Sequence, residues 1–355
     1  MARLLIKNGR VFDGRHFFYA DVLTEGGVIA RIAPGIRESA DTVYDATGET
    51  VSAGLVDVHV HMRGISSPHF GIQAEMSCFP FGVTACVDAG GGQGDLALLN
   101  SFAIKSAVLV TVPIRDNRPD LAAADEQLRR YGDRAIGFKV YFDTDVSDVR
   151  DAQPLREICD HAHERGLFVM VHSSNSPVNM GQILDAMHKG DVLTHAYHGG
   201  RHAADEDGYR AMRAARERGV ILDAGFAGHV HTDFSVLERA IACGLAPDTV
   251  STDITRYSAY MRGGRYGMTM CMSIARTLGM TEEAVFAAVT SRAAEVIGKA
   301  QEWGTLAVGR AADIAVLKTC EESFDLTDAA GHRVTSPVGY RCVLTVSDGQ
   351  VVYRH

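Results

Sequence analysis

The sequence lacks paired cysteines, long apolar runs and any excess of positive charge. Its seven cysteines are scattered, odd in number and without a Cys-x-x-Cys pair, which is typical of a reducing compartment. A net charge of −9 leaves no basic face for a phosphate backbone, so we expect no nucleic-acid partner. The apolar run in MARLLIKNGR ends after a few residues, which predicts neither a signal peptide nor a membrane span and favours a cytoplasmic location.

The chain also has few prolines, nine in 355 residues, and neither a low-complexity tract nor a run of like charges, so disorder is not expected. It does have short apolar runs of strand length, separated by amphipathic stretches such as 120–131, 151–165, 205–218 and 234–243. The expected strands are 55–61, 83–89, 107–114, 135–142, 168–174, 192–197, 220–225 and 249–254. Eight strands alternating with helices predict an α/β fold, a TIM-like (β/α)8 barrel.

The two ends of the chain have a different texture. Residues 1–50 and 304–355 alternate short strand-like runs with Gly and Asp turns, including an Asp-Gly pair at 348–349. A barrel takes about 250 residues, so about a hundred remain for this part. We expect both ends to pair in one small β-sandwich domain, with the barrel, residues 51–303, inserted between them.

Six polar residues lie in or at the ends of the apolar runs, where a buried strand would normally carry none. They are His59, His61, Lys139, His172, His195 and Asp253. The C-terminal ends of barrel strands converge on one face, so these residues would become neighbours there. Imidazole and carboxylate are usual ligands of divalent metals, and the two histidines of the His-x-His pair point to the same side of their strand. Without a metal, each unsatisfied buried group would cost roughly 1–3 kcal/mol, so the pattern predicts a metal site.

With those residues placed, the chain resembles the amidohydrolase superfamily over nearly its full length. The marks are GLVDVHVH at the first strand, a lysine on the fourth, histidines ending the fifth and sixth, aspartate ending the eighth, and the closing segment GTLAVGRAADIAVL. The phrases GDVLTHAYHG and PDTVSTDI are most similar to a dihydroorotase-like branch that includes deacetylases. The chain departs from these relatives in two places. Residues 59–65 read HVHMRGI, without the Pro-Gly that dihydroorotases carry after the arginine. Residues 225–231 read GFAGHVH, where deacetylases have a histidine soon after the first glycine.

The resemblance implies a binuclear metal centre. His59, His61 and Asp253 would hold one metal, His172 and His195 the other, and Lys139 would bridge them as a carbamate formed from CO2. Zinc is the expected metal, with manganese, cobalt or iron as alternatives. A metal-bridging hydroxide would attack the substrate carbonyl, and Asp253 would take its proton and deliver it to the leaving group. Asp253 is thus both a ligand and the expected catalytic acid/base.

Substrate recognition is expected from loops that follow the strands. The candidate substrate-binding residues are Arg63, His69, Tyr141, His229, His231, Arg256 and Arg262. An arginine at the position of Arg63 binds the substrate carboxylate in dihydroorotases, and the arginines after the eighth strand also suit an acidic substrate. The alternative for each is a side chain that packs on its own loop.

The sequence therefore predicts a metal-dependent amidohydrolase that hydrolyses an amide or ester bond of a small acidic substrate, as deacetylases do. A cyclic amidase of the dihydroorotase or hydantoinase type is the alternative within enzymes. A catalytically silent relative is a third hypothesis, and the complete set of six ligands argues against it. Relatives often form homo-oligomers, so this chain is a candidate for one by analogy.

Overall fold

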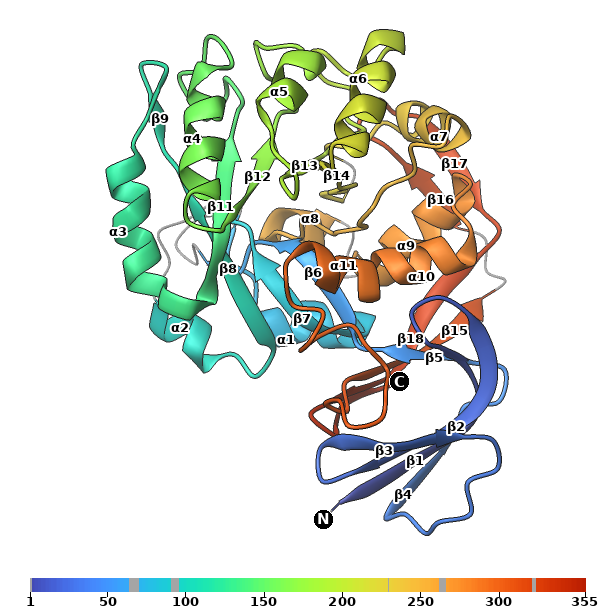
Figure 1. The fold of residues 1–355 in the computed structure, drawn as a ribbon. Coiled ribbons are helices and arrows are strands. Elements are labelled where there is room, and N and C mark those ends of the chain that lie inside the picture. Colours follow the sequence, from blue (N-terminus) through green and yellow to red (C-terminus); the bar gives the residue numbers. More distant parts are fainter. Residues whose placement is uncertain (1, 64–69, 91–95, 229, 262–265, 321–323) are drawn as a thin grey trace.

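The computed structural model describes residues 2–63, 70–90, 96–228, 230–261, 266–320 and 324–355. Three candidate substrate residues, His69, His229 and Arg262, lie outside the described residues. Figure 1 shows a body of strands and surrounding helices, with a second sheet below it that holds both chain ends. The described chain has no helix that is both long and apolar enough to span a bilayer.

The larger body is built on seven parallel strands in the order β14-β13-β12-β11-β8-β7-β6. They are β6 (Leu55–Val60), β7 (Val83–Asp88), β8 (Lys105–Thr111), β11 (Ala135–Tyr141), β12 (Phe168–His172), β13 (Val192–Thr194) and β14 (Ile221–Leu222). Most of their residues are buried, as parallel strands covered on both faces require, which explains their nearly continuous apolar sequences. Seven of the eight predicted strands are therefore present, several of them shorter than predicted.

The eighth predicted strand, 249–254, is not a regular strand, so that prediction is wrong in detail. Its residues instead form isolated parallel bridges, from Thr249 to Asp223 beyond β14 and from Ile254 to Val60 of β6. The backbone N–H of Asp253 also donates to the carbonyl of His59 at 2.8 Å. Asp253 has a φ of 47°, in the left-handed region, which interrupts an extended strand. The segment thus links the two edges of the parallel sheet.

Helices follow most strands of this sheet and cover it (Figure 1). They are α1 (Ala74–Cys78), α2 (Leu96–Ser101), α3 (Leu121–Tyr131), α4 (Gln153–His163), α5 (Met180–Ala186), α6 (Glu206–Glu217), α7 (Phe234–Ala242), α8 (Arg256–Met261), α9 (Met268–Thr277), α10 (Glu282–Ala288) and α11 (Ser291–Val296), with 3-10 turns at Phe79–Phe81 and Gly132–Arg134. Asp120, Asp205 and Asp233 cap α3, α6 and α7 by accepting backbone N–H groups, which explains where these helices begin.

The second sheet is mixed and draws strands from both ends of the chain, in the order β19-β18-β15-β5-β1-β2-β3 with β4 beside β1. Its members are β1 (Arg3–Phe12), β2 (Phe17–Glu25), β3 (Val28–Ala33), β4 (Thr42–Asp45), β5 (Thr50–Ala53), β15 (Ile314–Cys320), β18 (Gly339–Ser347) and β19 (Gln350–Arg354). Ile6, Val22, Ile314 and Val346 belong to one apolar cluster that spans it. That this sheet forms a two-layered sandwich remains a prediction, and so do the domain limits 1–50 with 304–355 and 51–303.

Two short hairpins lie apart from both sheets: β9 (Ile114–Arg115) with β10 (Arg118–Pro119), and β16 (Phe324–Thr327) with β17 (Arg333–Ser336). The second interrupts the C-terminal part of the mixed sheet between β15 and β18. In Figure 1 it lies beside α7, on the body of the parallel sheet and away from β15 and β18. The pattern of 304–355 predicted that this whole segment belongs to the small domain. It did not predict that the β16–β17 hairpin lies on the body of the parallel sheet.

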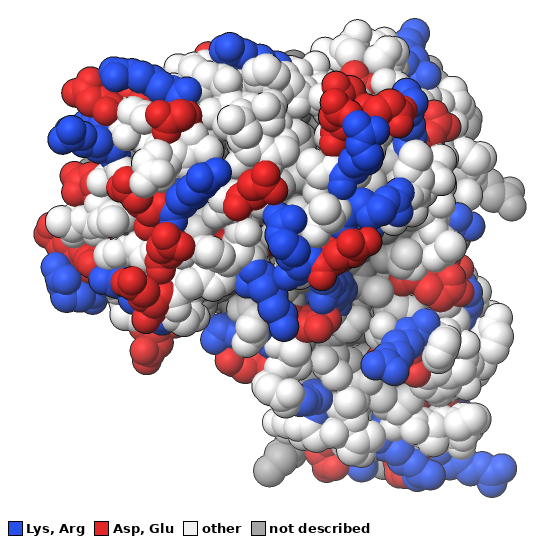
Figure 2. Space-filling view, turned by 45° about the horizontal axis from the view of Figure 1, so that its top comes forward, with Lys and Arg blue, Asp and Glu red and all other residues white. Residues whose placement is uncertain are grey.

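Charged side chains of both signs lie on the face of the molecule that Figure 2 draws. Figure 2 shows acidic and basic residues interspersed over one face. Exposed pairs such as Lys299 with Glu302, 2.9 Å apart, contribute at most about 1 kcal/mol each. Surface charge on this face therefore does not mark a candidate site.

Candidate metal centre

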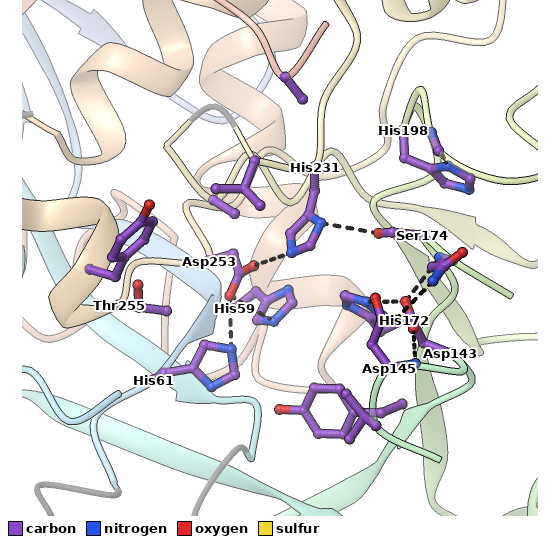
Figure 3. Close-up of a pocket in the computed structure, with 18 of the residues that line it drawn as sticks. His59, His61, Asp143, Asp145, His172, Ser174, His198, His231, Asp253 and Thr255 are labelled. Carbon is purple, nitrogen blue, oxygen red and sulfur yellow. Dashed lines mark hydrogen bonds and ion pairs between the residues drawn. The ribbon is translucent and has the colours of Figure 1, made fainter. Parts of the chain in front are cut away.

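The six predicted residues converge at the C-terminal ends of the parallel strands. Figure 3 shows His59, His61, His172 and Asp253 around one space. His61 Nε2 lies 2.8 Å from Asp253 Oδ1, and His59 Nε2 lies 3.3 Å from the same oxygen. His195 Nε2 lies 3.6 Å from the other carboxylate oxygen, Oδ2. Asp253 thus stands between the histidines of the first strand and the histidine that follows β13.

The donor atoms fall into two groups whose members lie within 4.8 Å of one another. One group is His59, His61 and Asp253, as predicted for the first metal. The other is His172, His195 and His231, so His231 joins the two histidines predicted for the second metal. Lys139 is fully buried, with its Nζ 3.2 Å from His59 Nε2.

Backbone carbonyls fix the tautomers of two histidines. His61 Nδ1 donates to the carbonyl of Gly90 at 2.7 Å, and His195 Nδ1 donates to the carbonyl of Gly225 at 2.6 Å. A carbonyl only accepts, so the proton is on Nδ1 and the lone pair is on Nε2, ready for a metal. Both glycines have positive φ, and a Cβ on Gly225 would lie 2.5 Å from His195 Nδ1, so a larger residue would displace the imidazole.

A buried relay fixes His59 in the same way. The hydroxyl of Thr194 donates to Asp223 Oδ2 at 2.7 Å, so its oxygen accepts the proton of His59 Nδ1 at 3.0 Å. Asp223 also accepts the hydroxyls of Thr249 and Ser251, each at 2.7 Å. The lone pair of His59 is therefore on Nε2, which faces Lys139 and Asp253.

Asp143 holds His172 in the opposite orientation. His172 Nε2 donates to Asp143 Oδ2 at 3.1 Å, which leaves the lone pair of Nδ1 for a metal. Burial opposes ionisation of Asp143, but hydrogen bonds from His172 and from the backbone of Asp145 and Asn175 outweigh it and lower the pKa of this carboxyl. Four histidines thus have a positioned acceptor on one ring nitrogen and a free lone pair on the other.

Burial sets the protonation states of the centre. Loss of hydration lowers the pKa of His59 and of His195 well below the usual value, and it lowers the pKa of Lys139 to about 8. Burial of Asp253 acts against its charge, but His59 and His61 outweigh that effect and lower its pKa. The site therefore presents neutral imidazoles at His59 and His195, an ionised carboxylate at Asp253 and an amine at Lys139 that is easily made neutral.

This donor set fits divalent metal ions. His195 Nε2 is buried and has no hydrogen-bond partner among the described residues, an arrangement that costs free energy unless a ligand satisfies it. His195 and Asp253 both have left-handed backbones, with φ of 55° and 47°. Strain of this kind concentrates at functional sites, where the surrounding structure holds it. Bound metal would satisfy the imidazole and the carboxylate together.

A cavity of about 620 Å³ opens in front of the centre. It is lined by His59, His61, Phe70, Tyr141, Asp143, Asp145, Val146, His172, Ser174, Asn175, His198, Gly199, Gly200, Ala227, Val230, His231, Asp253, Thr255, Tyr257, Ala329 and Ala330. Two of the predicted substrate residues, Tyr141 and His231, are in this lining. The buried hydroxyl of Tyr141 makes no hydrogen bond to any residue that the structure describes, and His231 Nδ1 lies 3.2 Å from Ser174 Oγ.

Two further predicted substrate residues, Arg63 and Arg256, are not part of this lining. Arg63 is 3% exposed, and its guanidinium donates to Asp88, to the hydroxyl of Tyr131 and to the carbonyl of Leu109, so its donors are directed into the core. Arg256 donates to the carbonyl of Gly71 at 3.1 Å and lines a neighbouring cavity instead. Among the described residues, no arginine or lysine lines the cavity at the metal centre.

Several cavity residues were not found from the sequence. Asp143 and Asp145 follow the fourth strand in YFDTD, a position that could have marked them, because loops after strands face the site. Ser174 and Asn175 follow the fifth strand in the same way. Ala329 and Ala330 come from the β16–β17 hairpin, and small apolar residues in a C-terminal turn give no sequence signal.

Strand-end histidines, a buried carboxylate and a lysine at one face of a parallel sheet define a metal-dependent hydrolase as the class. A model of the amidohydrolase family matches residues 81–353, and the protein belongs to this family. Members of this family depend on metal ions.

Relatives agree with this assignment. The chain is 28% identical to a deacetylase of Enterococcus faecalis over 98% of both chains. It is 25% identical to a dihydroorotase of Anaeromyxobacter dehalogenans over 99% of this chain and 98% of the other. Its structure matches that of a dihydroorotase with a TM-score of 0.87 at 24% identity, over 99% of both chains. It matches an adenine deaminase with a TM-score of 0.85, also at 24% identity, over all of both chains. These structural likenesses show the fold.

Proposed function

We propose that the protein is a binuclear deacylase that hydrolyses an amide or ester bond of a small acylated substrate. The observation that carries the proposal is the pair of donor groups, His59, His61 and Asp253 beside His172, His195 and His231, at the head of an open cavity. The identity to the Enterococcus faecalis deacetylase over nearly the whole of both chains supports it.

The first group would hold one divalent ion, His172 and His195 would hold the second, and zinc is the proposed metal. Lys139 would bridge the two as a carbamate. A neutral amine is needed to react with CO2, and burial lowers the pKa of Lys139 to about 8, which supports this proposal. Its Nζ lies 3.2 Å from His59 Nε2 of the first group, and its charge lowers the pKa of His172 in the second, a position that suits a bridge.

When bound, the two ions would supply a water activated for attack and would polarise the substrate carbonyl. Asp253 acts as the acid/base: ionised in the free enzyme, its carboxylate accepts a proton from the attacking water and delivers it to the leaving nitrogen or oxygen. The hydroxyl of Tyr141, buried without a partner among the described residues, donates to an oxygen of the substrate. His231, held by Ser174, faces the same space.

The alternative is a cyclic amidase, which the 25% identity to the Anaeromyxobacter dehalogenans dihydroorotase favours. The placement of Arg63 counts against it, because the guanidinium that would bind the carboxylate of a dihydroorotate-like ring lies in the core beside Asp88. The same placement removes an argument for an acidic substrate. The proposal therefore concerns an acylated small molecule without requiring an acid.

A turnover panel separates the two activities. Zinc-loaded protein is tested with N-acetyl amino acids of both hands, acetylated hydroxy acids, dihydroorotate and hydantoins, and acetate release and ring opening are measured. Acetate release from an acetylated compound supports the deacylase. Ring opening without acetate release would make the protein a cyclic amidase.

We also propose that the parallel sheet and the segment 249–254 form a closed (β/α)8 barrel. The bridges from Thr249 and Ile254 to opposite edges of the sheet support closure. The mixed sheet would form a small sandwich domain from both chain ends. We propose further that the protein requires no partner other than its small-molecule substrate. We also propose that it assembles into a homo-oligomer and is located in the cytoplasm.

A further inference from the structure

The β16–β17 hairpin brings the C-terminal part of the chain to the metal centre. Within the part of the chain that the structure describes, its strands pair only with each other, in the register Phe324 with Ser336 to Thr327 with Arg333. In Figure 1 the hairpin lies beside α7. In Figure 3 the red-tinted C-terminal ribbon borders the upper edge of the pocket. A segment between two strands of the mixed sheet thus contributes to a cavity built otherwise by loops of the parallel sheet.

Specific contacts fix the tip of the hairpin. Asp328 is 2% exposed, and its Oδ2 accepts the backbone N–H of Phe234, the first residue of α7, at 2.8 Å. Asp328 Oδ1 accepts the N–H of His332 at 2.8 Å, which closes the turn. The N–H of Ala329 donates to the carbonyl of Thr232 at 3.3 Å. The tip is therefore attached to the loop that also carries His231.

The base of the hairpin is attached as well. Ser336 is fully buried, and its Oγ lies 2.6 Å from the hydroxyl of Thr277 at the end of α9. Partly buried Val334 packs on the main core. Because both ends of the hairpin are held, the position of its tip relative to the metal centre is determined by the fold.

The two residues at the tip that face the cavity are alanines. Ala329 and Ala330 are exposed to the cavity, and Ala227 and Val230 contribute further apolar surface to its lining. Polar groups of the lining, such as Asp143 and Asn175, come from the loops after β11 and β12. The hairpin tip therefore adds apolar surface to the lining, and its two side chains are small.

We propose that the β16–β17 hairpin is the specificity wall of this site, with Ala329 and Ala330 making room for an uncharged hydrocarbon or aromatic group of the substrate. This inference rests on the proposed function, because it concerns the substrate of the same centre. An apolar group placed there would cover the alanines and Val230 and gain the free energy of removing apolar surface from water. A larger residue at the tip would occupy that space.

The test uses zinc-loaded full-length protein with Ala330→Leu, and Ala122→Leu as the matched control. Ala122 is an exposed alanine on α3, outside the cavity lining, and it controls for the added side chain itself. Binding of acetohydroxamate and benzohydroxamate, which share a metal-chelating group but differ in size, is measured by calorimetry. Metal content is measured on each variant.

Ala330→Leu is expected to weaken benzohydroxamate by about tenfold or more and acetohydroxamate much less, with metal content unchanged. Ala122→Leu is expected to leave both affinities as they are. Equal weakening of both ligands by Ala330→Leu, or no change in either, would overturn the proposal. Because hydroxamate binding needs no turnover, a protein that discriminates by size but releases no acyl group would contradict the proposed function and leave the specificity wall standing.

Discussion

Replacing Thr194 with valine should weaken metal binding without touching a ligand. Thr194 is fully buried at the end of β13, where it accepts the proton of His59 Nδ1 and donates to Asp223. Valine has a similar shape but no hydroxyl. His59 would lose the acceptor that fixes its tautomer, and its Nε2 would no longer be held toward the metal position.

The magnitude follows from the two hydrogen bonds lost. Removing the partner that orients a metal-binding histidine typically lowers metal affinity by about 10–100-fold, equivalent to about 1.4–2.7 kcal/mol. Asp223 loses one of three hydroxyl donors in a fully buried position, which lowers the free energy of unfolding by about 1–3 kcal/mol. The same calculation applies to Thr249→Val, since Thr249 donates to Asp223 Oδ1 at 2.7 Å and, among the described residues, makes no hydrogen bond to a histidine of the centre.

Thr249→Val is therefore the matched control. Zinc affinity is measured by competition with a chelator, and the free energy of unfolding of the metal-free proteins is measured with urea. Both variants should lose similar stability, and only Thr194→Val should lose zinc affinity. Equal zinc affinities in the two variants would refute the relay from Asp223 through Thr194 to His59.

Three further predictions concern single residues of the centre and its surroundings. Asp253→Asn should lower the hydrolysis rate by about 10²–10⁴-fold through loss of the acid/base, and a rate near that of the unaltered protein in a kinetic assay would contradict that role. Because the pKa of Lys139 is lowered to about 8, the neutral amine increases as pH rises through that value. Reactivation of metal-free protein by zinc and bicarbonate should accordingly be faster about one pH unit above 8 than one below, and Lys139→Gln should show no dependence on bicarbonate. Arg63→Met should destabilise the fold by about 3–5 kcal/mol in urea titrations, because it removes the only cation paired with the buried Asp88 among the described residues and leaves that carboxylate with backbone N–H donors alone. A stable variant with only a raised KM would instead support a substrate-binding role of Arg63.

The convergence of the six residues could be predicted because each breaks a buried apolar run. A polar residue such as His172 at the end of β12 has no reason to be there unless the site needs it, and parallel strands bring their C-terminal ends together. The irregular backbone of segment 249–254 was less predictable. Thr249, Ser251 and Thr252 direct their hydroxyls to buried carboxylates, and the left-handed backbone of Asp253 then ends the extended conformation.

The partners of Arg63 could not be predicted from the sequence. Its position after the His-x-His pair predicted a substrate contact, but Asp88 at the end of the neighbouring strand β7 accepts from its Nε at 2.9 Å. A buried carboxylate without a partner would be costly, so the ion pair directs the guanidinium into the core. The ion pair depends on β7 lying beside β6 in the fold, and the sequence around residue 63 alone does not show this neighbour.

The hairpin tip at Ala329 and Ala330 could not be found for a similar reason. Alternation of strands and turns in 304–355 indicates β structure, yet it does not say which sheet a given strand joins. The contact that decides the matter, from the N–H of Phe234 to Asp328, links residues 94 positions apart. The sequence around Asp328 alone does not predict this hydrogen bond.

The central claim is that two metal ions are bridged by a carbamate on Lys139. The most direct test is a high-resolution crystal structure of protein reconstituted with zinc and bicarbonate, with the anomalous signal measured beside Lys139. The account predicts two metal peaks among the donors of His59, His61, His172, His195 and Asp253, and density for a carboxylated lysine between them. A single metal peak beside an unmodified lysine would contradict it.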